Sequence, residues 1–364
     1  MTRPVTCGES LIALLESYGV DTVFGIPGVH TLDLYRGLAD SSIRHVQARN
    51  EQGAGFMADG YARLSGKPGV CILISGPGVT NACTPMGQSF ADSIPVLVIS
   101  STTASYSLGK GWGCLHEVTD LESVTRPLTA LSATAGSAAE LEGLIGQAFS
   151  IFAAERPRPV HIAVPIDVLA ESVPSSWQVR QPPARPAPPA QAINQAAALL
   201  RQAERPVIYA GGGAAGAAQT LTGIAERLDA AVITSNAGKG VVPDSHPLCL
   251  GGGIVRSPVR DFLSQADVVL AIGTEISETD SFVPKLSLTG KLIRIDIDPR
   301  KINDLYPADI GILGDAATAA SQLLEALGPE DTARGTAETV SVVRRSMFDD
   351  LTDSESRPIR LLKV

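Results

Sequence analysis

The chain has 364 residues, of which 44% are hydrophobic and 18% are charged, which is enough apolar material for about two domain cores. Acidic residues outnumber lysines and arginines by 38 to 29, and the resulting net charge of -9 argues against binding to nucleic acid. Because no apolar stretch approaches the roughly 20 residues of a membrane span and the first residues lack a signal-peptide core, we expect a cytoplasmic protein with no membrane contact.

Apolar runs alternate with helical periods from residue 6 to residue 165. The first helix has its own start signal, because Thr6 and Glu9 form a capping box ahead of leucines at helical spacing. This alternation predicts an α/β domain over residues 1–172, with a doubly wound, mostly parallel sheet covered by helices on both faces. Its expected strands cover residues 22–27, 43–49, 69–75, 95–100 and 159–165.

Residues 173–191 are too rich in proline to continue a helix or a central strand, and we interpret them as an interdomain linker. The alternation resumes over residues 192–328 and predicts a second doubly wound domain of the Rossmann-like type. From residue 329 the sequence turns polar, and residues 357–364 read as the opening of an amphipathic helix. We therefore expect residues 329–364 to hold a linker and the start of a truncated third domain.

The most informative segment is Asn50-Glu51-Gln52-Gly53-Ala54-Gly55. It places a carboxylate at the point where an expected strand ends and a helix rich in small residues begins. A glutamate in a first helical turn is ordinarily just a favourable partner of the helix dipole. Two glycine–proline turns lie at the same expected sheet edge, Gly25-Ile26-Pro27-Gly28 and Gly76-Pro77-Gly78-Val79-Thr80-Asn81. Either turn alone is compatible with a structural role. Because ligands bind at the carboxyl edge of open α/β sheets, the three features together predict a ligand site.

These segments resemble the pyrimidine-binding domain of thiamine-diphosphate enzymes of the acetolactate synthase and 2-oxo acid decarboxylase type. The likeness extends through Asp92-Ser93-Ile94-Pro95-Val96 and covers nearly all of residues 5–325. It implies thiamine diphosphate as cofactor, with Glu51 as the catalytic residue that exchanges a proton with the aminopyrimidine ring. The cofactor-binding residues that it implies are Gly25, Ile26, Pro27, Gly28, Glu51, Gly76, Pro77, Gly78, Asn81 and His116.

Two positions depart from the family pattern. Asn50 stands where the family usually has histidine, and Leu115-His116-Glu117 stands where it has Phe-Gln-Glu. The second departure puts His116 where the family's glutamine faces cofactor and substrate, so it bears on substrate preference. The alternative for His116 is an ordinary loop histidine.

The family holds the cofactor's diphosphate through Mg²⁺, using Gly-Asp-Gly and a later asparagine in a third domain. These 364 residues contain no such pattern; Gly314-Asp315-Ala316 is a near miss. The cysteines and histidines never fall at metal-ligand spacing, so we assign no metal ligand to this chain. We expect an incomplete form, inactive alone, that forms a homo-oligomer or joins a partner carrying the diphosphate-binding domain.

The second domain contains Gly211-Gly212-Gly213-Ala214-Ala215-Gly216, which satisfies the dinucleotide pattern G-x-G-x-x-G. The next expected strand ends in Thr234-Ser235-Asn236 without the acidic residue that such a site requires. The resembled middle domain binds FAD in some family members, but residues 251–256 and 274–280 depart from those members, and we do not expect FAD.

We expect thiamine-diphosphate-dependent decarboxylation of a 2-oxo acid, or carboligation of the acetolactate synthase kind. The acidic segment 274–280 resembles that of decarboxylases acting on a guanidino-substituted 2-oxo acid. The alternative is a non-catalytic module that binds FAD or NAD through residues 211–216.

Overall fold

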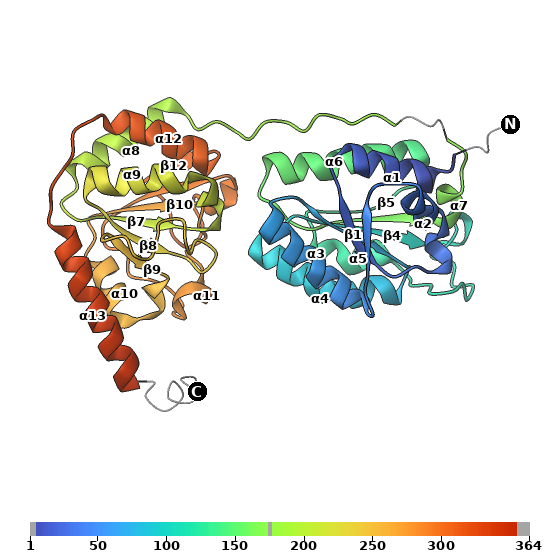
Figure 1. Ribbon diagram of the computed structural model, residues 1–364, viewed down its shortest axis with the longest axis horizontal. Coiled ribbons are helices and arrows are strands. Elements are labelled where there is room, and N and C mark those ends of the chain that lie inside the picture. Colours follow the sequence, from blue (N-terminus) through green and yellow to red (C-terminus); the bar gives the residue numbers. More distant parts are fainter. Residues whose placement is uncertain (1–4, 174–176, 355–364) are drawn as a thin grey trace. The chain divides into compact units, whose positions relative to one another are not determined.

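The structure is a computed structural model that describes residues 5–173 and 177–354 (Figure 1). The chain divides into two compact units, Met1–Ala184 and Arg185–Val364. Each unit has one six-stranded sheet, and every strand pairing within both sheets is parallel. The predicted fold class, two doubly wound α/β domains, is therefore confirmed.

The first sheet has the strand order β2-β1-β3-β4-β6-β5. Its strands are β1 (Thr22–Gly25), β2 (Arg44–Gln47), β3 (Gly69–Leu73), β4 (Val96–Thr102), β5 (Leu131–Thr134) and β6 (Val160–Pro165). Strands β3, β4 and β6 are buried along their whole length, as expected where helices cover both faces of a parallel sheet. Strand β5 was not predicted, because its four residues are only partly buried and carry no apolar run.

Helices cover both faces of the first sheet (Figure 1). The predicted capping box is present at the first helix, where Thr6 Oγ1 accepts from Glu9 N at 3.3 Å and Glu9 Oε2 accepts from Thr6 N at 2.8 Å. The helices on one face are α1 (Cys7–Ser17), α2 (Leu32–Ala39), α6 (Ala138–Ala154) and α7 (Ile166–Leu169). Those on the other are α3 (Glu51–Ser65), α4 (Pro77–Asp92) and the short α5 (Leu121–Thr125).

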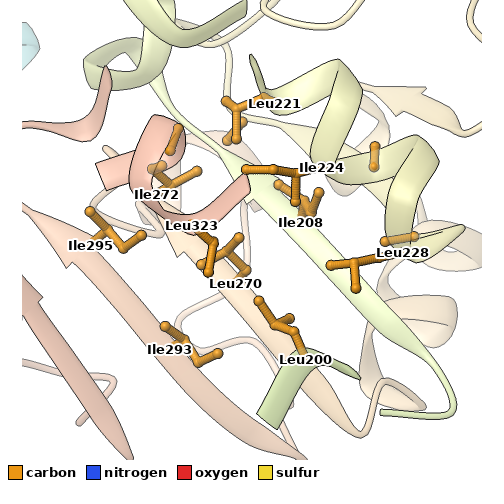
Figure 2. Packing of buried hydrophobic residues seen from close by; sticks show 14 of the residues in the cluster. Leu200, Ile208, Leu221, Ile224, Leu228, Leu270, Ile272, Ile293, Ile295 and Leu323 are labelled. Atoms are coloured by element: carbon orange, nitrogen blue, oxygen red, sulfur yellow. The ribbon is translucent and has the colours of Figure 1, made fainter. Parts of the chain in front are cut away.

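The second sheet has the strand order β12-β11-β10-β7-β8-β9. Its strands are β7 (Pro206–Ala210), β8 (Ala231–Thr234), β9 (Cys249–Gly251), β10 (Val268–Ile272), β11 (Lys291–Asp296) and β12 (Ile310–Leu313). Its helices are α8 (Ala190–Gln202), α9 (Ala218–Leu228), α10 (Ser257–Ser264), α11 (Glu278–Ser281), α12 (Ala316–Leu327) and α13 (Thr336–Ser354). Helices α8, α9 and α12 cover one face, where leucines and isoleucines interdigitate with the strands (Figure 2).

The proline-rich stretch is anchored at both ends. Its part before residue 184 contacts the first unit, and its part after residue 184 contacts the second. Arg180 N donates to Tyr18 Oη in the first unit at 3.0 Å. Arg185 pairs with Asp315 at 2.9 Å in the second unit. Asp315, the acid of the Gly-Asp-Ala near miss, also caps α12 by accepting from Thr318 N at 2.9 Å, so its role here is structural.

Helix α13 packs on the second unit. Val340 is fully buried, and Arg344 donates to the main-chain carbonyls of Asp244, His246 and Cys249. Residues 336–347 therefore extend the second unit, although their polar composition suggested a linker. Residues 357–364, the expected start of an amphipathic helix, lie outside the described residues. Within the described residues, no helix is long and apolar enough to cross a membrane.

His161 is a buried polar residue in β6 and is fully hydrogen-bonded. Its Nε2 meets Ser100 Oγ at 2.8 Å, and its Nδ1 meets Thr125 Oγ1 at 2.8 Å. Burial disfavours the charged imidazolium and lowers the pKa of His161 to about 4.

We therefore predict that His161 stays neutral down to about pH 4. The unfolded chain takes up this proton near the ordinary pKa of about 6.5, so the stability from His161 is complete above that pH. As the pH falls from 6.5 to 4, the free energy of unfolding should drop by on the order of 3 kcal/mol from this group. An NMR titration of the ring measures the folded pKa, and a midpoint near 6.5 would contradict the prediction.

Candidate active site

The two predicted glycine–proline turns lie on either side of the topological switch point of the first sheet. Strand β1 pairs with β2 on one side and with β3 on the other, so the chain reverses its direction of progress across the sheet between β1 and β3. Residues 25–28 follow β1, and residues 76–78 follow β3. Ligands of open α/β sheets bind at such a point, in the crevice outside the carboxyl ends of the strands.

Glu51 is the first residue of α3 and is half-buried. Asn81, from the first turns of α4, donates from Nδ2 to Glu51 Oε2 at 2.9 Å. The other carboxylate oxygen, Oε1, has no hydrogen-bond partner among the described residues. Asn50 caps α3 by accepting from Gln52 N at 2.8 Å, which explains why an asparagine suits this position.

Ile74 brings both turns against Glu51. A Cβ placed on Gly28 would lie 2.5 Å from Ile74 Cγ2, and a Cβ on Gly78 would lie 2.8 Å from Ile74 Cγ1. The Gly78 position is also 3.7 Å from Glu51 Cγ. A side chain at either position would therefore have to displace Ile74, and Gly28, Gly78 and Glu51 lie close together.

The other predicted residues of the turns occupy distinct environments. A Cβ on Gly25 would lie 2.2 Å from the carbonyl oxygen of Ile72, so the β1 turn also follows the β3 backbone closely. Ile26 packs partly against the core beneath α3. Pro27 and Pro77 are exposed.

His116 reaches the same edge from a later loop. A Cβ on Gly76, whose φ is 53°, would lie 2.2 Å from the carbonyl oxygen of His116. His116 itself has a φ of 59°, an uncommon conformation for a residue with a side chain. The structure thus brings all the predicted turn residues, Glu51, Asn81 and His116 to one edge.

His30 lies at this edge and was not predicted from the sequence. Its ring is 5.9 Å from that of His116, at an interplanar angle of 89°. The Nδ1 atoms of both rings are enclosed and have no hydrogen-bond partner among the described residues. Burial, and then the neighbouring His116, lower the pKa of His30, so His30 is neutral near pH 7. Its position two residues after Gly28 was the available signal.

The small residues of α3 make close contacts within the chain. A Cβ on Gly55 would lie 2.3 Å from Pro85 Cγ of α4, and Ala54 and Ala58 are fully buried. Gly53 is exposed and has no atom within 4 Å of its Cβ position.

The glycine run of the second unit is also accounted for by packing inside the chain. A Cβ on Gly211 would lie 2.1 Å from the carbonyl oxygen of Gly273, and one on Gly213 would lie 3.0 Å from Gly273 Cα. The loops after β7 and β10 therefore meet backbone to backbone. In the acidic segment 274–280, Glu275 pairs with Lys301 at 2.8 Å and Asp280 accepts from Asn236 N at 2.8 Å. Within the described residues, no group of three or more His, Cys, Asp or Glu is placed to hold a metal ion.

Comparison with protein families matches both units. Residues 5–123 match the model described as thiamine pyrophosphate enzyme, N-terminal TPP binding domain. Residues 193–323 match the model described as thiamine pyrophosphate enzyme, central domain.

Individual relatives are similar over most of this chain. A protein of Pseudomonas aeruginosa named probable 2-ketoarginine decarboxylase AruI is 53% identical over 345 residues, which cover 94% of this chain and 61% of the relative. A probable acetolactate synthase large subunit of Methanocaldococcus jannaschii is 37% identical over 88% of this chain and 56% of its own length. The acetolactate synthase isozyme 1 large subunit of Escherichia coli is 34% identical over 88% of this chain and 57% of its own length. The chain thus spans 56–61% of the length of these relatives.

The contact of Gly76 with His116 generates a stability prediction. Gly76→Ala should lower the free energy of unfolding of the first unit by at least about 2 kcal/mol, because the methyl group meets the His116 carbonyl and the positive φ disfavours side chains. The control is Gly53→Ala, an open helical position, which should raise it by about 0.5–1 kcal/mol. Denaturant unfolding measures both, and equal effects of the two changes would contradict the assigned contact.

Proposed function

Because the chain belongs to the thiamine pyrophosphate enzyme family through its N-terminal and central domains, we propose that its first unit supplies the pyrimidine-binding half of a thiamine diphosphate site. The enzyme that contains this site acts on a 2-oxo acid. The observation that carries the proposal is the hydrogen bonding of Glu51 at the switch point. Its Oε2 accepts from Asn81, and its Oε1 has no hydrogen-bond partner among the described residues.

The residues at this edge fit an aminopyrimidine ring. Oε1 of Glu51 is available to hydrogen-bond a ring nitrogen, while the bond from Asn81 restrains the carboxylate. Gly78 lets the start of α4 pack against Ile74 beside Glu51. The enclosed Nδ1 atoms of His30 and His116 leave hydrogen-bonding capacity unused at the same edge.

When bound, thiamine diphosphate supplies a nucleophilic carbon that adds to the ketone of a 2-oxo acid and takes up the electron pair left by departing carbon dioxide. Glu51 Oε1 exchanges a proton with the pyrimidine ring. Asn81 keeps Glu51 oriented throughout, and the neutral His30 adds no positive charge near the ring.

We further propose that the substrate is a guanidino-substituted 2-oxo acid and that the outcome is decarboxylation. The support is the 53% identity to the protein named probable 2-ketoarginine decarboxylase, together with the acidic segment 274–280. Carboligation is the second outcome, supported by the acetolactate synthase relatives. We also propose that the site works in a homo-oligomer or with a partner that carries a diphosphate-binding domain. We propose the cytoplasm as its location, where the five free cysteines would stay reduced.

We predict that the chain by itself binds thiamine diphosphate weakly. The pyrimidine contacts alone should give a dissociation constant in the millimolar range, on the order of 4 kcal/mol of binding free energy. Titration calorimetry with thiamine diphosphate and Mg²⁺ measures it. A submicromolar, Mg²⁺-dependent constant would show that these residues also hold the diphosphate.

We predict that Glu51→Gln abolishes most of the activity once a diphosphate-binding domain is supplied in cis or in trans. Glutamine keeps the shape and the hydrogen bonding but cannot exchange the proton, so a loss of about 10²–10⁴-fold is expected. Release of carbon dioxide from the 2-oxo acid is the assay. The control, Glu142→Gln, changes a half-buried carboxylate of α6 that accepts from Gln178 N and should leave the rate unchanged. A Glu51→Gln enzyme with near-normal activity would refute the assignment.

A further inference from the structure

A single carboxylate closes the loop that carries His116. Glu117 accepts hydrogen bonds from the main-chain N–H groups of Gly111 at 2.8 Å, Gly113 at 2.9 Å and Cys114 at 3.1 Å. Such charge-assisted bonds are the stronger kind. Partial desolvation acts in the opposite direction, but the bonds from Cys114, Gly111 and Gly113 prevail and lower the pKa of Glu117.

The backbone of this loop is suited to that closure. Gly109, Gly111 and Gly113 have φ angles of 69°, 66° and 75°, in the region that favours glycine. Trp112, between two of them, is 64% exposed, so packing of its side chain does not hold the loop in place. The carboxylate of Glu117 is therefore the main restraint on residues 111–114. We call this arrangement the Glu117 clamp.

His116 lies within the clamp, between Cys114 and Glu117, and adopts a costly conformation. A residue with a side chain at positive φ costs roughly 1–2 kcal/mol and persists only where its surroundings impose it. Three contacts restrain it here: the clamp formed by the next residue, the close approach of the His116 carbonyl to Gly76, and the hydrogen bond that this carbonyl accepts from Ser75 Oγ at 3.5 Å. This conformation sets the His116 ring edge-to-face with the ring of His30.

The position of His30 is fixed by a short turn of its own. It lies in the 3-10 helix η1 (Val29–Thr31), where Thr31 Oγ1 accepts from Gly28 N at 3.1 Å and donates to Gly28 O at 3.1 Å. The two imidazoles therefore come from separate loops, and the loop of His116 is the one that Glu117 closes. An imidazole N–H is a donor, which suits the keto and carboxylate oxygens of a 2-oxo acid because both only accept hydrogen bonds.

We propose that Glu117 is a positioning residue that holds His116 against His30, so that the two imidazoles form the substrate-binding wall of the site onto which Glu51 opens. The substrate role rests on the proposed function, whereas the positioning role concerns this chain alone. The Nδ1 atoms of both rings are buried and have no hydrogen-bond partner among the described residues, which is uncommon for buried polar atoms.

The test of positioning uses the full chain with ¹⁵N-labelled histidine, whose five histidines give separable ring signals. Signals of His30 and His116 are assigned with His30→Gln and His116→Gln. Glu117→Gln should shift the His30 and His116 signals and leave His161 and His246 in place. The control is Glu122→Gln, which removes only an ion pair with Arg126 in the next helix and should shift neither of the pair.

A second measurement reports the mobility of the clamped loop through Trp112. With Trp177→Phe, Trp112 becomes the only tryptophan of the chain, and Glu117→Gln should lower its fluorescence anisotropy. Glu117→Asp, whose shorter carboxylate cannot span the three amides, should act in the same direction. The proposal is overturned if neither change moves the His30 and His116 signals, or if His161 shifts with them, because Glu117 would then support the whole unit.

The holoenzyme tests the substrate role. Glu117→Gln should raise KM for the 2-oxo acid by about tenfold and leave the thiamine diphosphate concentration for half-activation unchanged. A change in the cofactor requirement without a change in KM would overturn this part. If the wild-type protein showed no response to thiamine diphosphate, the proposed function would fail, while the histidine signals would still decide whether Glu117 positions His116.

Discussion

Side chains are sterically excluded at four positions along the carboxyl edge of the first sheet. A Cβ on Gly25, Gly28, Gly76 or Gly78 would lie 2.2–2.8 Å from an atom of Ile72, Ile74 or His116. Everything else at the site follows from this close approach. The chain segments after β1 and β3 can lie side by side, α4 can begin beside α3, and Asn81 can reach Glu51. The chemistry of the site is thus built on main-chain contacts, with few side chains added.

Much of this could be predicted from the sequence because its signals are local. The Thr6 capping box, the buried strands and the glycine–proline turns each occupy a few consecutive residues. Parallel strands share one carboxyl edge, so a parallel sheet was enough to predict that the turns and Glu51 lie at the same edge.

The features that were missed depend on contacts between distant segments. The position of His30 two residues after Gly28 places it at the edge, but its ring contact with His116 joins segments 86 residues apart and has no local signal. Helix α13 was hidden by its polar composition, although Val340, Val343 and Met347 lie on one helical face and pack on the second unit. The Glu117 clamp was visible in principle, as alternate glycines followed by a carboxylate, but that pattern has no established meaning by itself.

The two units have similar glycine-rich turns after their strands, but the turns have different surroundings. In the second unit, Gly211 and Gly213 approach Gly273, and the two loops close against each other. In the first unit, the turns approach Ile74 and stop beside a carboxylate with a free oxygen. A glycine pattern therefore reports close backbone packing, and the residues around it decide whether a ligand can enter.

Ile74 touches the turn after β1 with one branch of its side chain and the turn after β3 with the other. A branched side chain has few rotamers, so pressure on one branch is transmitted to the other rather than absorbed. The two turns are thereby mechanically coupled through a single residue. A change at Ile74 would therefore alter the packing of both turns at once.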